Sequence, residues 1–198
     1  RFGATHQIDR WVIEEVCAQL AAHPRHLAQL DACHINLSGR SFDQEDFADF
    51  VVAILERHNL PGEKLCFEIT ETAAAYSLTD VTTFMERLGD YGCTFALDDF
   101  GAGLSSFGYL RRLPVDCIKI DGTFVRHIDS DNTDLAMVRA INEIGQTLGK
   151  TIVAEFVESE ATLALLREMG VHYAQGFGIH RPCRFERLLA ATRPEHMR

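Results

Sequence analysis

Polar side chains that can bind a metal or move a proton stand at the ends of most short apolar runs in this 198-residue sequence. Carboxylate and amide oxygens are the hard ligands that Mg²⁺ and Mn²⁺ prefer. Two adjacent acids, such as Asp98 and Asp99, suit a pair of ions that assists displacement at a phosphoryl group. The residues at or just after the ends of these runs are Asn36, Glu68 with Glu71, Asp98 with Asp99, Lys119 with Asp121, Glu155 with Glu158, and Gln175.

Alternation along each predicted strand divides these runs into a charged face and an apolar face. Successive side chains of a strand point to opposite sides. The apolar face is expected to meet helices, and the charged groups are expected to converge at the carboxyl end of a parallel sheet. The charged face carries Glu68, Asp98, Lys119, Asp121 and Glu155, and the apolar face carries Phe67, Ile69, Leu97, Ile118, Ile120 and Ala154.

Four negative charges crowd toward one end of the predicted sheet, with one cation in reach. Buried charges are costly unless they are paired or bound to a metal. One interpretation is a salt-bridge network around Lys119. Four acids against one ammonium would leave negative charge that divalent cations neutralise, so the pattern favours a metal site. The four acids are Glu68, Asp98, Asp99 and Glu155.

Apolar periodicity indicates the elements that position these groups, because it alternates between helical and strand spacing. Strands that alternate with helices predict an α/β fold with a parallel sheet. A (β/α)₈ barrel would make the strand ends converge, whereas a doubly wound sheet would spread them along a line. Ser41 is expected to cap the second helix, with Glu45 nearby. The predicted helices span 8–20, 42–57, 78–88, 134–148, 160–169 and 185–191, and the predicted strands span 34–37, 65–70, 94–98, 117–120, 151–157 and 173–174.

Composition and charge exclude several classes of protein. Hydrophobic residues make up 46% and charged residues 24%, which excludes a disordered or fibrous chain. The net charge of −10 argues against binding DNA or RNA in a basic groove. No apolar run reaches the length of a membrane span, and no G-x-G-x-x-G or Walker A motif is present. The six cysteines form no C-x-x-C pair, which predicts core thiols in a reducing cytoplasm and no zinc site.

Six ordered motifs together resemble the EAL family of cyclic-di-GMP phosphodiesterases over essentially the whole chain. This resemblance implies a modified (β/α)₈ TIM-like barrel. It also implies a bacterial signalling enzyme that hydrolyses cyclic di-GMP to linear pGpG with Mg²⁺ or Mn²⁺, using a pair of ions. The motifs are NLS at 36–38, FEITET at 67–72, LDDFGAGLSS at 97–106, LPVDCIKIDGTFV at 113–125, VAEFVE at 153–158 and AQGFGIHRP at 174–182.

The resemblance also implies a role for each polar residue. Lys119 resembles the family's lysine that contacts the attacking water, and Glu155 resembles a carboxylate beside that water and the second ion. Glu71 resembles the residue that anchors the loop after Asp99. Asn36, Glu68 and Asp98 resemble ligands of the first ion and Asp99 a ligand of the second, while Glu158 and Gln175 resemble pocket-shaping groups and Asp121 is expected to face the substrate.

The sequence departs from the family pattern at several points. The defining Glu-Ala-Leu tripeptide is absent, and six strands are predicted where the family has eight. A barrel of this type needs about 250 residues, so we expect roughly 50 residues and about two strands before Arg1. Residues 1–198 would then be an N-terminally incomplete EAL domain. Ala102, Leu104 and Phe156 stand where Thr, Tyr and Gly are common in the family.

The resemblance further implies a setting for the domain. The full-length protein is expected to form a homodimer, to carry flanking sensor or GGDEF-type domains, and to act in the cytoplasm, with membrane anchoring through other domains left open. Two other functions remain open. One is a catalytically inactive cyclic-di-GMP receptor. The other is a metal-independent glycosidase that uses Glu68 and Glu155 as a carboxylate pair.

Overall fold

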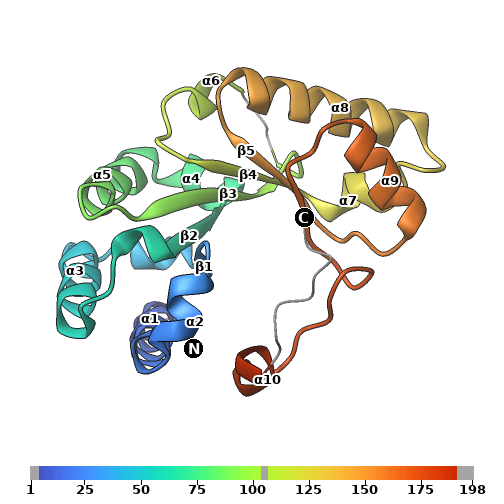
Figure 1. Ribbon diagram of the computed structural model, residues 1–198. Helices are drawn as coiled ribbons and strands as arrows, with labels where there is room; N and C mark the ends of the chain where they lie inside the picture. The colour runs from blue at the N-terminus through green and yellow to red at the C-terminus, as the bar shows by residue number, and fades with distance from the viewer. Residues whose placement is uncertain (1–4, 104–106, 191–198) are drawn as a thin grey trace.

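Six parallel strands form one sheet, and each strand pairs with its neighbours along the chain. The computed structural model describes residues 5–103 and 107–190. The sheet curls, and the helices wrap its convex side (Figure 1). The predicted α/β fold, a barrel-like parallel sheet, is confirmed in the described residues. The strands are β1 (Cys33–Leu37), β2 (Leu65–Thr70), β3 (Thr94–Phe100), β4 (Cys117–Ile120), β5 (Thr151–Ala154) and β6 (Tyr173–Ala174).

Five of the helices in the described residues are long and cover the outside of the sheet, and the rest are single turns or pairs of turns near strand ends. The long helices are α1 (Thr5–Ala22), α3 (Phe47–His58), α5 (Leu78–Gly89), α8 (Asn132–Thr147) and α9 (Glu160–Glu168). The short ones are α2 (Pro24–Gln29), α4 (Glu71–Tyr76), α6 (Phe107–Leu110), α7 (Gly122–Val125) and α10 (Phe185–Ala190), with 3₁₀ turns at Gly39–Ser41 and Gly62–Lys64.

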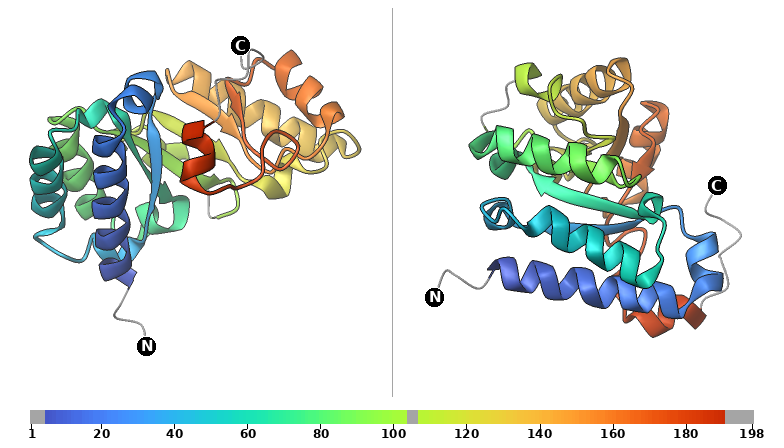
Figure 2. Two further views of the ribbon diagram at one scale, coloured as in Figure 1. Left: turned by 60° about the horizontal axis from the view of Figure 1, so that its bottom comes forward. Right: turned by 90° about the vertical axis from the view of Figure 1, so that its left-hand side faces the viewer.

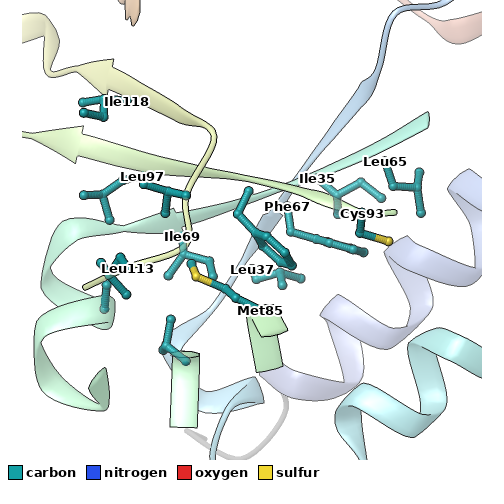
Figure 3. Packing of buried hydrophobic residues seen from close by; sticks show 14 of the residues in the cluster. Ile35, Leu37, Leu65, Phe67, Ile69, Met85, Cys93, Leu97, Leu113 and Ile118 are labelled. Atoms are coloured by element: carbon teal, nitrogen blue, oxygen red, sulfur yellow. The ribbon is translucent and has the colours of Figure 1, made fainter. Parts of the chain in front are cut away.

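The main hydrophobic core lies between the convex face of the sheet and these helices. The predicted apolar face of the strands is buried there, as Figure 3 shows for residues of β1 to β4 together with Met85 of α5. A separate small cluster lies on the concave face. Its buried members are Cys66, Ala96, Cys117 and Val153, which alternate with the residues of the main core along their strands. The two faces of each strand therefore have different neighbours, as the alternation predicts.

Two strands lose their regular alternation directly after an inward-facing acid. Asp99 has φ 53°, and the register between β3 and β4 shifts between Leu97 and Phe100. Phe156 also has φ 53°. The predicted strand over 151–157 was therefore too long, because β5 ends at Ala154 and the chain turns at Phe156. Bulges such as the one in β3 occur beside functional sites, where they re-aim a side chain.

The predicted helix over 42–57 begins later than expected. The α3 helix starts at Phe47, and Ser41 lies in the 3₁₀ turn rather than at a helix N-cap. The Ser41 hydroxyl donates to Oδ2 of the buried Asp9 at 2.6 Å, and the backbone N–H of Ser38 donates to the same oxygen at 2.8 Å. A partner 32 residues away thus decides the conformation of Ser41, which local capping preferences could not indicate.

The C-terminal segment crosses the open side of the curled sheet. It brings α10 near α1, as the right view in Figure 2 shows. The Phe185 ring makes edge contacts with the rings of His23 and His26, each at 5.7 Å between centroids. All six cysteines are free thiols. Within the described ranges we find no helix with both the length and the apolar character needed to cross a membrane.

Candidate metal centre at the carboxyl edge of the sheet

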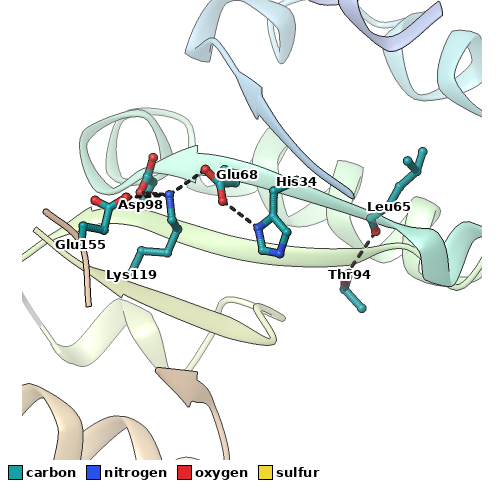
Figure 4. A network of polar contacts seen from close by, with 7 residues as sticks. All are labelled: His34, Leu65, Glu68, Thr94, Asp98, Lys119 and Glu155. Atoms are coloured by element: carbon teal, nitrogen blue, oxygen red, sulfur yellow. Dashed lines mark hydrogen bonds and ion pairs between the residues drawn. The ribbon is translucent and has the colours of Figure 1, made fainter. Parts of the chain in front are cut away.

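Lys119 lies at the centre of the charged face and contacts three acids from three other strands or strand ends. Its Nζ atom lies 2.7 Å from Oε2 of Glu68, 2.9 Å from Oδ1 of Asp98 and 2.8 Å from Oε1 of Glu155. Figure 4 shows these groups in a row across the sheet. The Lys119 side chain is only 3% exposed. The sheet curl thus brings together residues from β2, β3, β4 and the end of β5.

The charges in this row shift one another's pKa. Burial alone would lower the pKa of Lys119, but the surrounding carboxylates, Glu68 first, raise it above its usual value, so the ammonium stays charged. Burial would raise the pKa of Glu68, yet His34 and Lys119 lower it overall. The Nδ1 atom of His34 lies 2.7 Å from Oε1 of Glu68. Contacts with Cys66 and Glu68 raise the pKa of His34 to about 10.

Asp98, Asp99 and Glu155 form a cluster in which potential ligand oxygens lie within 4.8 Å of one another. Burial, followed by the charge of Asp98, raises the pKa of Asp99. Burial likewise raises the pKa of Glu155, despite its ion pair with Lys119. A divalent cation would relieve this repulsion. In addition, Oδ1 of Asp98 is buried and accepts no hydrogen bond of good geometry within the described residues, although Lys119 lies 2.9 Å away.

The charge balance of the cluster fits a divalent cation. The acids Glu68, Asp98, Asp99 and Glu155 carry four negative charges when ionised. Protonated His34 and Lys119 supply two positive charges, so two negative charges remain uncompensated among these groups. The salt-bridge network around Lys119 considered from the sequence is present, but it does not balance the charge. The oxygen donors therefore suit Mg²⁺ or Mn²⁺.

Asn36 and Asp121 lie at the border of this cluster. Asn36 is exposed on β1, and its Cα pairs in register with that of Glu68 on β2. Asp121 caps the short α7 helix, where its Oδ1 accepts the N–H of Thr123 at 2.7 Å. Asp121 also interacts with Asp99. The structure thus places Asn36 beside Glu68 and Asp121 beside Asp99.

Glu71 lies away from the lysine network and contacts the segment that follows Asp99. Its Oε2 accepts the N–H of Gly101 at 3.0 Å, and its Oε1 accepts the hydroxyl proton of Tyr109 at 2.7 Å. Glu71 is only 3% exposed, so it is not a solvated surface acid. Burial and Glu71 both raise the pKa of Tyr109. Leu104, within the same predicted loop, lies outside the described residues.

Glu158 and Gln175 stand apart from the acid cluster. Both side chains are exposed. The backbone of Gln175 nevertheless joins the sheet edge, because its N–H donates to Ala154 at 2.8 Å and its carbonyl accepts from Val157 at 3.0 Å. Gln175 also lines a cavity of about 540 Å³ on the concave face, next to Lys119. That cavity extends toward the amino ends of the strands, where Asp116 and Thr151 line it, and not toward Asp99.

Sequence reasoning missed the contacts of three residues around the site. The sequence alone assigned no role to His34, which lies on the concave face and contacts Glu68. Its position two residues before Asn36 on one strand was a usable signal, since alternate residues share a face. Tyr109 and Asp9 gave no such signal, because each acts through a partner about 30 or more residues away.

The curled parallel sheet and its acid cluster define a barrel-like α/β protein with a candidate metal site at the carboxyl ends of the strands. The family model described as "EAL domain" matches residues 1–182, so this chain belongs to the EAL domain family. Among curated proteins, it is 38% identical over 182 residues to the cyclic di-GMP phosphodiesterase PdeB of Shewanella oneidensis. It is 37% identical over 196 residues to the bifunctional diguanylate cyclase/cyclic di-GMP phosphodiesterase MucR of Pseudomonas aeruginosa.

Solved structures of related proteins share the fold. A structure described as PaMucR phosphodiesterase in complex with c-di-GMP has a TM-score of 0.86 and 37% identity, and the match covers 92% of this chain and 74% of that one. The EAL domain of Mycobacterium smegmatis DcpA has a TM-score of 0.88 and 31% identity, with coverages of 93% and 83%. Among the curated relatives, this chain spans 21% of the length of PdeB and 28% of that of MucR.

Proposed function

We propose that this domain hydrolyses cyclic di-GMP to linear pGpG with the help of Mg²⁺ or Mn²⁺. The reaction would be phosphodiester hydrolysis at the carboxyl edge of the sheet. The observation that carries the proposal is the cluster of Asp98, Asp99 and Glu155 beside a buried, charged Lys119. Relatives at 38% and 31% identity are named cyclic di-GMP phosphodiesterases, which supports the choice of substrate.

The proposed ligands are side chains with hard oxygen donors at neighbouring strand ends. Asn36, Glu68 and Asp98 would hold one ion, and Asp99 would hold the second. Bound divalent ions would neutralise negative charge on the phosphate and activate a water molecule for attack. The uncompensated negative charge of the cluster supports this assignment, as does the buried Oδ1 of Asp98, which has an ion pair with Lys119 but no hydrogen bond of good geometry.

Lys119 and Glu155 would orient the attacking water. Lys119 is charged and held on three sides by carboxylates, so its ammonium group has little freedom to move. A fixed cation beside a water stabilises the hydroxide form as the proton leaves. Glu155 contacts Lys119 at 2.8 Å and belongs to the acid cluster, which supports its assignment to the same water. Glu158, Gln175 and Asp121 would shape the substrate pocket.

We also propose a cytoplasmic setting with flanking domains. The free state of all six cysteines is consistent with a reducing compartment. The curated relatives are several times longer than this chain, which supports additional domains of a sensor or GGDEF type in the full-length protein.

The test is turnover by the full-length protein with cyclic di-GMP and Mg²⁺ or Mn²⁺, followed by chromatography of pGpG. We expect pGpG to accumulate and EDTA to stop its formation. Tight binding without turnover would instead identify a cyclic-di-GMP receptor. Turnover that persists in EDTA would contradict the metal mechanism.

A further inference from the structure

The chain changes direction at a single residue directly after Glu155. Ala154 packs in the outer core, Glu155 points to the concave face, and Val157 returns to the outer core. Regular alternation would place Val157 on the same face as Glu155. The left-handed backbone of Phe156, with φ 53°, accounts for this break. On either side, the N–H of Glu155 donates to Ile120 at 3.3 Å and the N–H of Val157 donates to Gln175 at 3.0 Å.

A phenylalanine in this conformation is uncommon and needs support from its surroundings. The ring of Phe156 packs directly against Gly122, the first residue of α7. A Cβ atom added to Gly122 would lie only 2.1 Å from Cδ2 and 2.5 Å from Cγ of that ring. The guanidinium of Arg126 lies over the same ring, 4.4 Å from its centroid. The ring is 45% exposed, so hydrophobic burial accounts for only part of its placement.

The contact between Phe156 and Gly122 joins two segments of the metal centre. Gly122 directly follows Asp121, which caps α7 and interacts with Asp99. The N–H of Asp121 donates to the carbonyl of Phe100, immediately after Asp99, at 3.2 Å. On the other side of the contact, Phe156 directly follows Glu155. The ring therefore lies between the backbone that carries Glu155 and the backbone that supports Asp99.

We propose that Phe156 is a positioning residue whose ring, seated on Gly122, sets the distance between Glu155 and the Asp98–Asp99 pair. This inference rests on the proposed function, because it assigns a purpose to the spacing of those acids. Gly122 is required because a side chain there would occupy the space of the ring. The pair of residues acts as one spacer between β5 and the start of α7.

The test compares four variants of the full-length protein with wild type. Gly122→Ala should displace the ring and Glu155, weaken Mn²⁺ binding in nucleotide-free protein, and lower kcat by roughly tenfold to hundredfold, the scale expected for misplacement by about 1 Å. Phe156→Gly keeps access to the left-handed conformation without the ring, and it should lower kcat with little change in KM.

In the double variant, which combines Gly122→Ala with Phe156→Gly, the effect of Gly122→Ala should vanish. The double variant should therefore behave like Phe156→Gly alone. Phe156→Tyr keeps the ring and should retain most of the Mn²⁺ affinity.

Calorimetry of Mn²⁺ binding distinguishes a positioning role of Phe156 from a merely structural one. Thermal unfolding, measured in parallel, reports whether each variant is folded. Gly89→Ala is the matched control, because nothing lies within 4 Å of a Cβ added at Gly89. Wild-type Mn²⁺ affinity and kcat in folded Gly122→Ala would overturn the inference. If Gly122→Ala does not fold, wild-type values in Phe156→Gly would overturn it equally. A wild-type protein that neither binds Mn²⁺ nor cleaves cyclic di-GMP would overturn the proposed function itself.

Discussion

Lys119 differs from the exposed lysines and arginines of this protein because its charge is buried among carboxylates. Exposed ion pairs such as Arg57 with Glu14 contribute little to stability. Removing one partner of a buried pair is different, since it leaves uncompensated charge in a poorly solvated place. Lys119 therefore matters for the stability of the metal-free protein as well as for the proposed chemistry.

We predict that Lys119→Ala lowers kcat by orders of magnitude and leaves cyclic-di-GMP binding largely intact, because its proposed contact is with water. The same change should destabilise the metal-free protein by roughly 3–5 kcal/mol. Mn²⁺ should restore part of that loss, since the cation compensates Glu68, Asp98 and Glu155. Thermal unfolding with and without Mn²⁺, together with calorimetry of nucleotide binding, measures these effects.

Asp98→Asn serves as the comparison for Lys119→Ala, because it removes a proposed ligand rather than the lysine. It should weaken Mn²⁺ binding directly. If Lys119→Ala abolished nucleotide binding, Lys119 would be a phosphate-binding group and its assignment here would be wrong.

Glu71 is the second residue whose environment suggests a measurable role. We predict that Glu71→Ala lowers kcat by releasing the segment after Asp99, since it removes the acceptors for Gly101 and Tyr109. It should also lower the unfolding temperature, because Glu71 is buried and its loss leaves partly buried donors unpaired. Tyr109→Phe removes only one of these contacts and should have a smaller effect. Turnover measures the loss of kcat, and circular dichroism shows whether the variant is folded. Wild-type turnover in folded Glu71→Ala would contradict the anchoring role.

At the scale of elements, capping residues fix where helices start relative to the strands. Asp131 precedes α8, and its Oδ1 accepts the N–H groups of Thr133 at 2.7 Å and Asp134 at 3.3 Å. The hydrogen bond from Thr133, and then that from Asp134, lower the pKa of Asp131 below its usual value. A lowered pKa means that ionised Asp131 stabilises the fold above its ordinary pKa and that this stabilisation is lost as the pH falls through the folded-state pKa.

We therefore predict that Asp131→Ala lowers the unfolding temperature at neutral pH and that the difference from wild type shrinks as the pH falls below the ordinary pKa of aspartate. Asp131→Asn should retain much of the stability, because an amide oxygen can also cap a helix. Asp129→Ala, at an exposed neighbouring position, is the control. A difference between Asp131→Ala and wild type that did not change with pH would contradict the role of the ionised cap.

At the scale of the whole molecule, the curled sheet leaves its concave face and the cavity beside Lys119 accessible. We predict that the full-length protein is a homodimer in which subunit contact is coupled to the segment after Asp99. Sedimentation velocity of wild type and Glu71→Ala, measured alongside turnover, tests this coupling. A strictly monomeric wild-type protein with full activity would contradict it.

Much of this protein follows from its sequence alone. Hydrophobic periodicity is a local property, so the order of strands and helices and the two faces of each strand could be predicted. The residue types at the strand ends also indicated oxygen ligands for a divalent cation. The predicted bounds were least accurate at Ser41 and after Ala154, where contacts with Asp9 and the turn at Phe156 decide the conformation.

Only the tertiary structure decided how these residues meet. The three carboxylates around Lys119 lie 21 to 51 positions away from it in the chain, and the curl of the sheet determines their distances. The contact of His34 with Glu68 and that of Phe156 with Gly122 also join segments that are distant in the chain. These contacts depend on sheet curvature and on left-handed backbone at strand ends, which no local pattern of residues specifies.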